Sequence, residues 1–247
     1  MTNQLSLERL YHPDGKSLGA IVAGLSGSGK TTAVISTLQQ ANKKGSGFGE
    51  HHRFVVVDPK MQSGDYDLLA EPTYDVDSAL KSIQKERMTV YWPELEFMEA
   101  DVSELVNGIF DMADQNPKTS FSFILDEASI LITPTRIPPA LKRLAVQGRA
   151  KRIKPIFISQ RPIVNRWTDA NLSTMLLFNT LPVDHDTLSR RWGLDFNEHG
   201  QTTRDVPYSF IFFDMEKATF TPMEPVELPK KPRKRKRGVL DGFTGFF

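Results

Sequence analysis

The sequence predicts an α/β fold in which a mostly parallel central sheet is flanked by helices. Apolar runs rich in β-branched and aromatic residues alternate with helical patterns, as strand–helix–strand units require. The run FSFIL at 121–125 is apolar throughout, which is typical of a central strand covered on both faces. The run SLGAIVA at 17–23 leads straight into a glycine-rich loop and then a helical pattern. Together with a length of 247 residues, these observations favour one large domain with appendages.

The elements of this domain follow from the same patterns. We expect an N-terminal extension at 1–16, the main domain at 17–221, and a basic, proline-rich mobile tail at 222–247. The expected strands are 17–23, 53–59, 88–92, 121–128, 154–160, 175–180 and 208–215, and the expected helices are 31–41, 75–87, 97–115, 138–150 and 184–193.

The composition excludes several classes of protein. With 39% hydrophobic and 25% charged residues, the chain is not wholly disordered. The absence of cysteine excludes disulfides and thiolate chemistry. No apolar run approaches the ~18–20 residues that cross a bilayer, and residues 1–15 lack the pattern of a secretory signal. We therefore expect a protein without a transmembrane segment that is not secreted.

The charge is distributed unevenly along the chain. Residues 230–247 hold seven of the 31 basic residues and one of the 30 acidic residues, so the rest of the chain has 24 basic and 29 acidic residues. An acidic body therefore carries a strongly basic tail. This separation indicates a polyanionic partner for the tail.

The stretch GLSGSGKTT at 24–32 matches the phosphate-loop motif G-x-x-x-x-G-K-[ST], also called Walker A, with a strand before it and a helix after it. Its glycines let backbone amides surround a phosphate at the helix N-terminus. We expect Lys30 to bridge the β- and γ-phosphates and Thr31 to bind Mg²⁺. The residues expected to contact the nucleotide are Gly24, Ser26, Gly27, Ser28, Gly29, Lys30, Thr31 and Thr32.

Two acids follow the strand that ends in FSFIL. Asp126 is placed to hold Mg²⁺ as a Walker B acid, and Glu127 is placed to activate the attacking water. The alternative is an Asp that caps a helix, followed by a first-turn Glu. The GTPase elements N/T-K-x-D and D-x-x-G are missing, and a small-molecule kinase does not need a Glu after the metal-binding Asp. The sequence therefore favours ATP hydrolysis.

Gln160 ends the next expected strand, KPIFISQ. In phosphate-loop ATPases with a catalytic Glu, this strand lies between the loop strand and the Walker B strand. The amide of Gln160 would then face the γ-phosphate, where it can donate to phosphate and accept from water. The alternative is an ordinary polar residue at a strand end.

These motifs together resemble those of the FtsK/HerA superfamily of DNA-pumping ATPases. The resemblance is carried by GLSGSGKTT (24–32), VVVDPK (55–60), ILDEAS (124–129), GRAKRIKP (148–155) and ISQRP (158–162). It implies a RecA-like P-loop NTPase fold of the ASCE type. A short chain without an accessory domain looks most like the genome-packaging ATPases of tailless icosahedral viruses with internal membranes. Such an enzyme uses ATP and Mg²⁺ and acts in the host cytoplasm or the virion.

The resemblance also implies an arginine that acts on a neighbouring subunit. Arg149 aligns with that arginine, and Arg152 and Arg161 are alternatives. An arginine supplied in trans offsets transition-state charge and couples hydrolysis to the neighbour's position. It implies a homo-oligomeric ring, by analogy a hexamer. Lys60, after the strand that ends at Asp58, would sense nucleotide, touch DNA phosphate, or form a loop salt bridge.

The tail is the last part that bears on function. KKPRKRKRG at 230–238 suits phosphate neutralisation without base reading, which would hold double-stranded DNA independently of its sequence. Anionic lipid binding and nuclear targeting are the alternatives. The terminal aromatic residues Phe243, Phe246 and Phe247 suggest docking to a capsid, membrane or subunit.

The leading hypothesis from the sequence is therefore an ATP-driven motor that packages viral double-stranded DNA. One alternative is a HerA-like or conjugative DNA translocase in repair or plasmid transfer. The other is a nucleotide-gated DNA-binding scaffold that assembles without useful hydrolysis.

Overall fold

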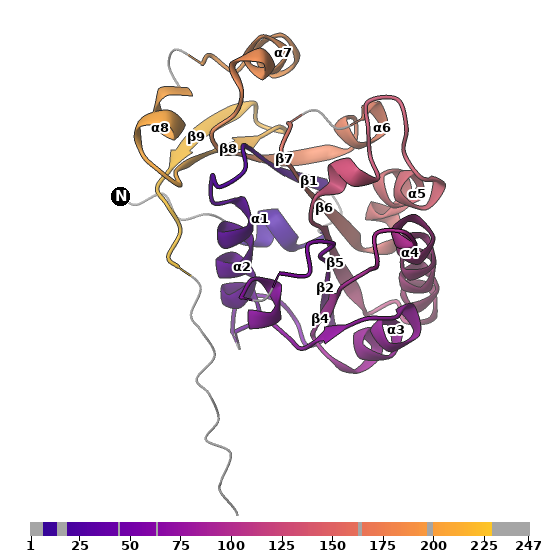
Figure 1. Ribbon diagram of the computed structural model, residues 1–247. Helices are drawn as coiled ribbons and strands as arrows, with labels where there is room; N and C mark the ends of the chain where they lie inside the picture. The colour runs from indigo at the N-terminus through magenta and orange to yellow at the C-terminus, as the bar shows by residue number, and fades with distance from the viewer. Residues whose placement is uncertain are drawn as a thin grey trace, which may run out of the picture.

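A nine-stranded, mostly parallel sheet with helices on both faces forms the centre of the molecule (Figure 1). The computed structural model describes residues 7–13, 19–43, 45–62, 64–162, 165–196 and 200–228. The strand order is β3-β4-β2-β5-β6-β1-β7-β8-β9, and only the pairs β7–β8 and β8–β9 are antiparallel. The predicted α/β fold is confirmed. The strands are β1 Gly19–Ala23, β2 His52–Val57, β3 Pro72–Thr73, β4 Met88–Tyr91, β5 Ser120–Leu125, β6 Ile153–Ser159, β7 Leu172–Leu177, β8 Phe210–Asp214 and β9 Thr219–Met223.

Helices cover the two faces of this sheet in two groups. In Figure 1, α3, α4 and α5 lie on one side of the central strands, and α1 and α2 lie on the other. Among the described residues, no helix is both long enough and apolar enough to cross a membrane. The helices are α1 Leu7–Tyr11, α2 Lys30–Ala41, α3 Val76–Lys85, α4 Met98–Gln115, α5 Pro139–Gln147, α6 Arg166–Asp169, α7 Pro182–Trp192 and α8 Gly200–Asp205.

The alternation of side chains along β1 produces two hydrophobic cores. Ile21 and Ala23 point into the cluster that contains the buried faces of α3 and α4. Ala20 and Val22 point into the second cluster, with α2. Because successive strand residues face opposite sides, an apolar five-residue strand can pack on both layers at once.

Strand β6 lies between the loop strand β1 and the acid-bearing strand β5, as the sequence predicts. Ile156 pairs with Ala20 of β1 on one side and with Ile124 of β5 on the other. All seven residues of β6 are buried. The carboxyl ends of these three parallel strands therefore meet at one edge of the sheet.

Each expected strand and helix of the main domain has a counterpart in the structure, with bounds that differ by a few residues. The short elements β3, α1, α6 and α8 carry too few residues for a periodic pattern and were not expected. Strand β9 corrects the expected start of the tail. It pairs with β8 and includes Pro222 and Met223, and proline is tolerated at an edge strand. The basic segment 230–238 and the terminal phenylalanines lie outside the described residues.

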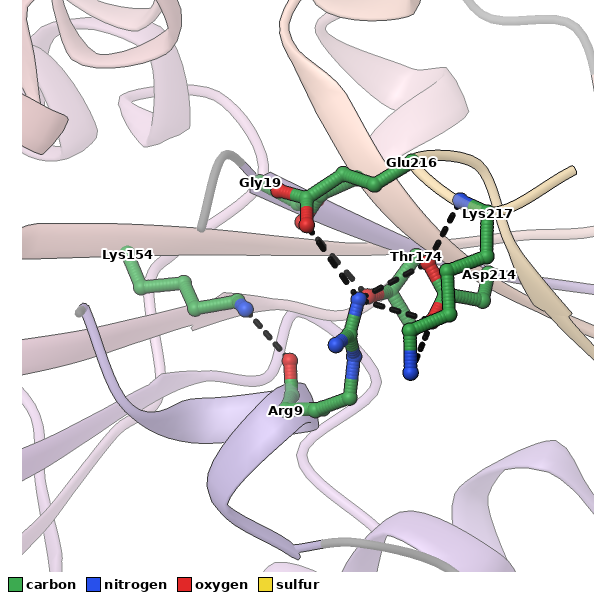
Figure 2. A network of polar contacts seen from close by, with 8 residues as sticks. Arg9, Gly19, Lys154, Thr174, Asp214, Glu216 and Lys217 are labelled. Carbon is green, nitrogen blue, oxygen red and sulfur yellow. Dashed lines mark hydrogen bonds and ion pairs between the residues drawn. The ribbon is translucent and has the colours of Figure 1, made fainter. Parts of the chain in front are cut away.

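Helix α1 joins the amino-terminal segment to the sheet through a polar network (Figure 2). The Arg9 guanidinium donates to Asp214 at 2.8 Å and pairs with Glu216 at 3.4 Å. The buried Lys154 ammonium of β6 donates to the Arg9 carbonyl. The next residues of α1, Leu10 and Tyr11, are fully buried. Residues 9–11, within the expected extension, therefore pack as part of the folded body.

Candidate functional site

The phosphate loop connects β1 to α2 and requires glycine at two of its positions. Gly24 has φ 152°, and a Cβ there would lie 2.6 Å from Cβ of Phe178. Gly29 precedes the first turn of α2 with φ 97°, and a Cβ there would lie 2.9 Å from Cδ1 of Tyr208. Both the backbone conformation and the close neighbours exclude a side chain. The loop therefore presents backbone amides at the N-terminus of a twelve-residue helix.

Lys30 is nearly buried at the start of α2 and folds back over the loop. Its ammonium donates to the carbonyls of Gly24 at 2.7 Å and Leu25 at 2.8 Å. Burial lowers the pKa of Lys30, and the negative charge of Glu127 partly offsets this effect. The Lys30 ammonium therefore lies within the phosphate loop, as the sequence motif predicts.

The other loop residues surround this cation. Ser26 and Gly27 are exposed, whereas Ser28, Thr31 and Thr32 are half-buried. The Ser28 hydroxyl is buried and has no hydrogen-bond partner among the described residues. An unsatisfied buried hydroxyl in a phosphate loop is a donor that a ligand can use.

Asp126 follows β5 and is 1% exposed. Its backbone amide donates to the Val57 carbonyl at 3.0 Å, which ties the end of β5 to that of β2. The Thr31 hydroxyl donates to Asp126 Oδ2 at 3.3 Å, across 95 positions of sequence. The two residues predicted to bind Mg²⁺ are therefore neighbours in space.

Glu127 is held beside Asp126 in a left-handed conformation, with φ 47° and ψ 45°. Its backbone amide donates to Asp126 Oδ1 at 2.7 Å, and the helical turn that follows spans only Ala128–Ile130. The alternative of a helix-capping Asp is wrong for this segment, because Glu127 occupies the cap position and makes no side-chain capping bond. A non-glycine residue in this region of φ/ψ is uncommon and often marks a functional site.

Lys60 pairs with both acids. Its ammonium lies 3.5 Å from Asp126 Oδ2 and 3.0 Å from Glu127 Oε1. Partial burial disfavours the charged form of Lys60, but the attraction of the two carboxylates outweighs it and raises the pKa. Of the roles considered for Lys60, the structure shows a salt bridge, and the partners of that bridge are the predicted metal-binding and water-activating residues.

Two further buried groups, Asp58 and Tyr66, interact electrostatically with Asp126. Asp58 is 1% exposed; burial, together with the charge of Asp126, raises its pKa to about 6, although the bond from the Lys60 amide opposes the shift. Burial likewise raises the pKa of Tyr66 well above its usual value, and Asp126 and Asp58 add to this effect. Asp58 Oδ2 and the Tyr66 hydroxyl have no partner among the described residues. Tyr66 lies in a loop without a recognisable motif, so no sequence signal points to it.

The donors at this edge fit a magnesium ion. A hard divalent cation prefers carboxylate and hydroxyl oxygens together with phosphate oxygens. Asp126 and Thr31 supply such oxygens next to the phosphate loop. A cationic group, the Lys60 ammonium, already lies 3.5 Å from the same carboxylate oxygen of Asp126, which shows that this point favours positive charge.

Gln160 follows β6 at the edge between the loop and Asp126. Ser159, the residue before it, pairs with Ala23 of β1, and its carbonyl accepts from the Gly24 amide at 3.3 Å. Gln160 itself is exposed. Its expected role near the γ-phosphate stays a prediction.

The three candidate arginines differ in their surroundings. Arg152 donates to the carbonyls of Ala113 and Thr119 and so closes the end of α4. Arg161 donates twice to Asp184 Oδ1 of α7, at 2.9 and 2.6 Å. Arg149 is exposed in a 3₁₀ turn before β6. Since the seven residues of β6 span about 20 Å, Arg149 lies at the opposite edge of the sheet from its own phosphate loop.

A pocket of about 310 Å³ opens beside the phosphate loop. One wall is the loop itself, residues 25–28, and another is Asn179, which follows β7. The third wall is the end of α8, with Arg204, and the segment between α8 and β8, with Tyr208. No sequence signal marks this wall, because its residues match no phosphate-binding motif.

Comparison with known proteins supports the resemblance seen in the motifs. No protein-family model matches the chain. The DNA packaging ATPase P9 of Enterobacteria phage PRD1 is 31% identical over 145 residues, which are 58% of this chain and 55% of that protein. The chain therefore matches about half the length of this curated relative.

Solved structures share the fold. The genome packaging NTPase B204 of Sulfolobus turreted icosahedral virus 2, in complex with ATP-gammaS, has a TM-score of 0.63 at 15% identity, over 85% of this chain and 98% of that chain. VirB4 of Thermoanaerobacter pseudethanolicus has a TM-score of 0.62 at 11% identity, over 85% of this chain and 90% of that chain. The predicted similarity to a genome-packaging ATPase is confirmed by the match to P9, and the solved structures confirm the fold.

Proposed function

We propose that this protein is an ATP-hydrolysing ring motor that moves double-stranded DNA, independently of its sequence, into a preformed viral capsid. The observation that carries the proposal is the meeting of Lys30, Thr31, Asp126 and Glu127 at one edge of the sheet, with β6 between their strands. The similarity to packaging ATPases supports viral DNA as the molecule that the motor moves. Such a motor would act in the host cytoplasm or at a virion vertex.

The proposed chemistry is attack of water on the γ-phosphorus of ATP, which releases ADP and phosphate. The amides of residues 24–32 and the Lys30 ammonium hold the phosphates, and Glu127 orients the water and accepts its proton. Asp126 and Thr31 would hold Mg²⁺, which neutralises charge on the β- and γ-phosphates. Gln160, at the tip of β6, would contact the γ-phosphate and the water.

Lys60 must release Glu127 before that residue can act as a base. In the structure its ammonium lies 3.0 Å from Glu127 Oε1, so that oxygen is held in an ion pair and is not available to a water molecule. Nucleotide phosphate offers Lys60 another anion within the same edge of the sheet. This exchange would couple nucleotide binding to activation of Glu127.

The position of Arg149 supports a ring. An arginine about 20 Å from its own phosphate loop can complete an active site only on a neighbouring subunit, and a closed head-to-tail ring supplies such a neighbour to every site. We propose a hexamer by analogy with the superfamily. Arg152 and Arg161 are the alternatives, and in this structure they contact the Ala113 carbonyl and Asp184. The tail would bind DNA or dock on capsid or membrane proteins at the vertex.

The test is the ATPase rate of the full chain with and without double-stranded DNA. Glu127→Gln should abolish hydrolysis, whereas Glu96→Gln, a matched change at an exposed acid outside the site, should not. Addition of Arg149→Ala subunits to wild type should lower activity more than in proportion to their share. Arg190→Ala subunits, changed at an exposed residue of α7, are the control. Unchanged hydrolysis by Glu127→Gln would instead favour the nucleotide-gated scaffold.

A second candidate, a conjugative DNA translocase, has one observation in its favour, the fold shared with VirB4. Packaging is preferred because the sequence match is to a packaging ATPase.

A further inference from the structure

We propose that the pocket between the phosphate loop and residues 203–209 is the nucleoside subsite of this protein, in which the ring of Tyr208 stacks on the base. This inference rests on the proposed function, because it takes the phosphate loop to hold the phosphates of the same ligand. It adds the part of the site that no motif assigns.

The first observation is the position of the pocket. Residues 25–28 of the phosphate loop form one wall, so a ligand whose phosphates lie on the loop has its remaining atoms beside this space. The volume of about 310 Å³ is at the lower end of the ~300–1,000 Å³ typical of small-molecule sites. The opposite wall comes from Arg204, Pro207, Tyr208 and Ser209. A nucleoside extending from the phosphates would fill the space between the walls.

The second observation is the ring of Tyr208. It lies against the loop, since Cδ1 is 2.9 Å from the position that a Cβ on Gly29 would take. Tyr208 is nevertheless 60% exposed, so one side of this aromatic residue is open. An open aromatic face at the mouth of a pocket is suited to stacking on a base.

The third observation is the backbone at Tyr208. Its φ of 65° is uncommon for a residue with a side chain, and such strained conformations often mark functional sites. Tyr208 lies in the turn between α8 and β8. The Ser209 hydroxyl stabilises this turn by donating to the Val206 carbonyl at 2.7 Å. The turn holds the ring beside Gly29 rather than in the core, as a ligand-binding role requires.

The polar groups of the pocket match a nucleoside as well. Asn179 lies next to the loop, since its carbonyl accepts from the Leu25 amide at 2.7 Å. Its side-chain amide, the Arg204 guanidinium and the unsatisfied Ser28 hydroxyl provide donors around one aromatic surface. A few polar groups around an apolar surface are typical of sites for small organic ligands.

The test compares two ligands that differ only by the adenosine part, ADP and inorganic pyrophosphate, by calorimetric titration of the full chain in Mg²⁺. Wild type should bind ADP more tightly than pyrophosphate. Tyr208→Ala should weaken ADP about tenfold, the equivalent of ~1.4 kcal/mol, and leave pyrophosphate within about twofold, because only the stacking surface is removed. Tyr208→Phe should bind both ligands as wild type does. Tyr74→Ala, at another exposed tyrosine outside the pocket, is the matched control.

Three outcomes overturn the subsite. They are an unchanged ADP affinity in Tyr208→Ala, an equal loss of ADP and pyrophosphate in that variant, and a wild type that binds ADP no more tightly than pyrophosphate. Lys30→Ala separates this failure from failure of the proposed function. If Lys30→Ala binds both ligands as wild type does, the phosphate loop is not the binding site, whatever the result at Tyr208.

Discussion

The two edges of the parallel sheet differ in how their buried polar groups are hydrogen-bonded. At the amino-terminal edge most of the buried groups are paired: Lys154 donates to the Arg9 carbonyl, and the ring of His52 binds the hydroxyls of Ser120 and Ser122. Arg87 donates there through Nη2 to the Ala41 and Phe48 carbonyls, and its Nε alone has no partner among the described residues. At the carboxyl-terminal edge, Asp58 Oδ2 and the Tyr66 hydroxyl are buried without a partner among the described residues. Both edges are built from the same parallel strands.

This difference suggests that the buried groups at the amino-terminal edge stabilise the fold and that those at the carboxyl-terminal edge serve ligand binding. Paired buried groups stabilise the fold, whereas an unpaired buried oxygen costs about 1–3 kcal/mol unless a ligand or water satisfies it. At the carboxyl edge this cost falls next to two acids and two lysines, Lys30 and Lys60. The groups there are arranged for a charged ligand. Substitutions at this edge should therefore change activity, and substitutions at the other edge should change stability.

The largest effect is expected from Lys30→Ala at the carboxyl edge. Loss of the ammonium that holds the phosphates should lower the ATPase rate at least about 100-fold, as removal of one preorganised charge-stabilising group does in other enzymes. The measurement is steady-state ATP hydrolysis, with circular dichroism to confirm the native fold. Lys85→Ala, at an exposed position of α3, should keep wild-type activity. If Lys30→Ala hydrolyses ATP at the wild-type rate, this edge is not the active site.

The next effect concerns Lys60, which competes with metal for Asp126. Lys60→Met should tighten Mg²⁺ or Mn²⁺ binding by the nucleotide-free protein about tenfold, equivalent to ~1.4 kcal/mol, because no ammonium then lies 3.5 Å from Asp126 Oδ2. Titration of Mn²⁺ followed by electron paramagnetic resonance measures this change. Lys43→Met, outside the site, is the matched control. Weaker binding in Lys60→Met would show that Lys60 supports the metal site instead of competing with it.

At the amino edge, Arg9→Ala should lower the free energy of unfolding by about 1–3 kcal/mol, because it leaves the nearly buried Asp214 carboxylate without its guanidinium. Urea denaturation measures the loss. The ATPase rate per folded molecule should stay at the wild-type value. Arg136→Ala removes a more exposed ion pair with Glu99 and should cost less. A large fall in activity without a loss of stability would contradict the division between the two edges.

The smallest effect is on pH dependence, and its sign should differ between the edges. Burial raises the pKa of Asp58 from its usual value near 3.8 to about 6, so between these values the folded state binds more protons and stability falls as the pH rises. Burial lowers the pKa of His52 from 6.5 to about 3, an effect to which His12 adds, so here the unfolded state binds more protons and stability falls as the pH drops.

Removal of each group should therefore change the pH profile in opposite directions. Asp58→Asn should gain on the order of 1 kcal/mol over wild type above pH 6, and His52→Gln should remove part of the loss of stability on acidification. Urea midpoints from pH 4 to 8 measure both changes. Profiles with the wild-type slope in both variants would show that neither group titrates differently on folding.

Much of the carboxyl-terminal edge was predictable because its functional residues belong to short, contiguous sequence motifs. The phosphate loop, the Asp126–Glu127 pair and Gln160 each follow an apolar strand, and parallel strands bring such ends together. The insertion of β6 between β1 and β5 was expected from the type of ATPase and is confirmed. The roles of these residues remain proposals.

Other parts were not predictable, because they depend on contacts between distant segments. The sequence favoured Arg149 with Arg152 and Arg161 as alternatives, and only the fold shows that Arg152 contacts the end of α4 and that Arg161 contacts Asp184. Strand β9 is short and contains threonine and proline, so its own sequence gives little indication of a strand. Its strand conformation depends on pairing with β8. Helix α1 has only five residues, and its place depends on Arg9 reaching a carboxylate 205 positions away.

The sequence by itself determined that the chain is an α/β protein with a phosphate loop, two acids after a central strand and a basic tail, because strand periodicity and motif spacing are local properties of the chain. Only the tertiary structure decided that Lys60 forms ion pairs with those acids and that Tyr208 lies against Gly29. Both contacts join segments far apart in the sequence. Their geometry depends on the order and register of the strands, which no local pattern specifies.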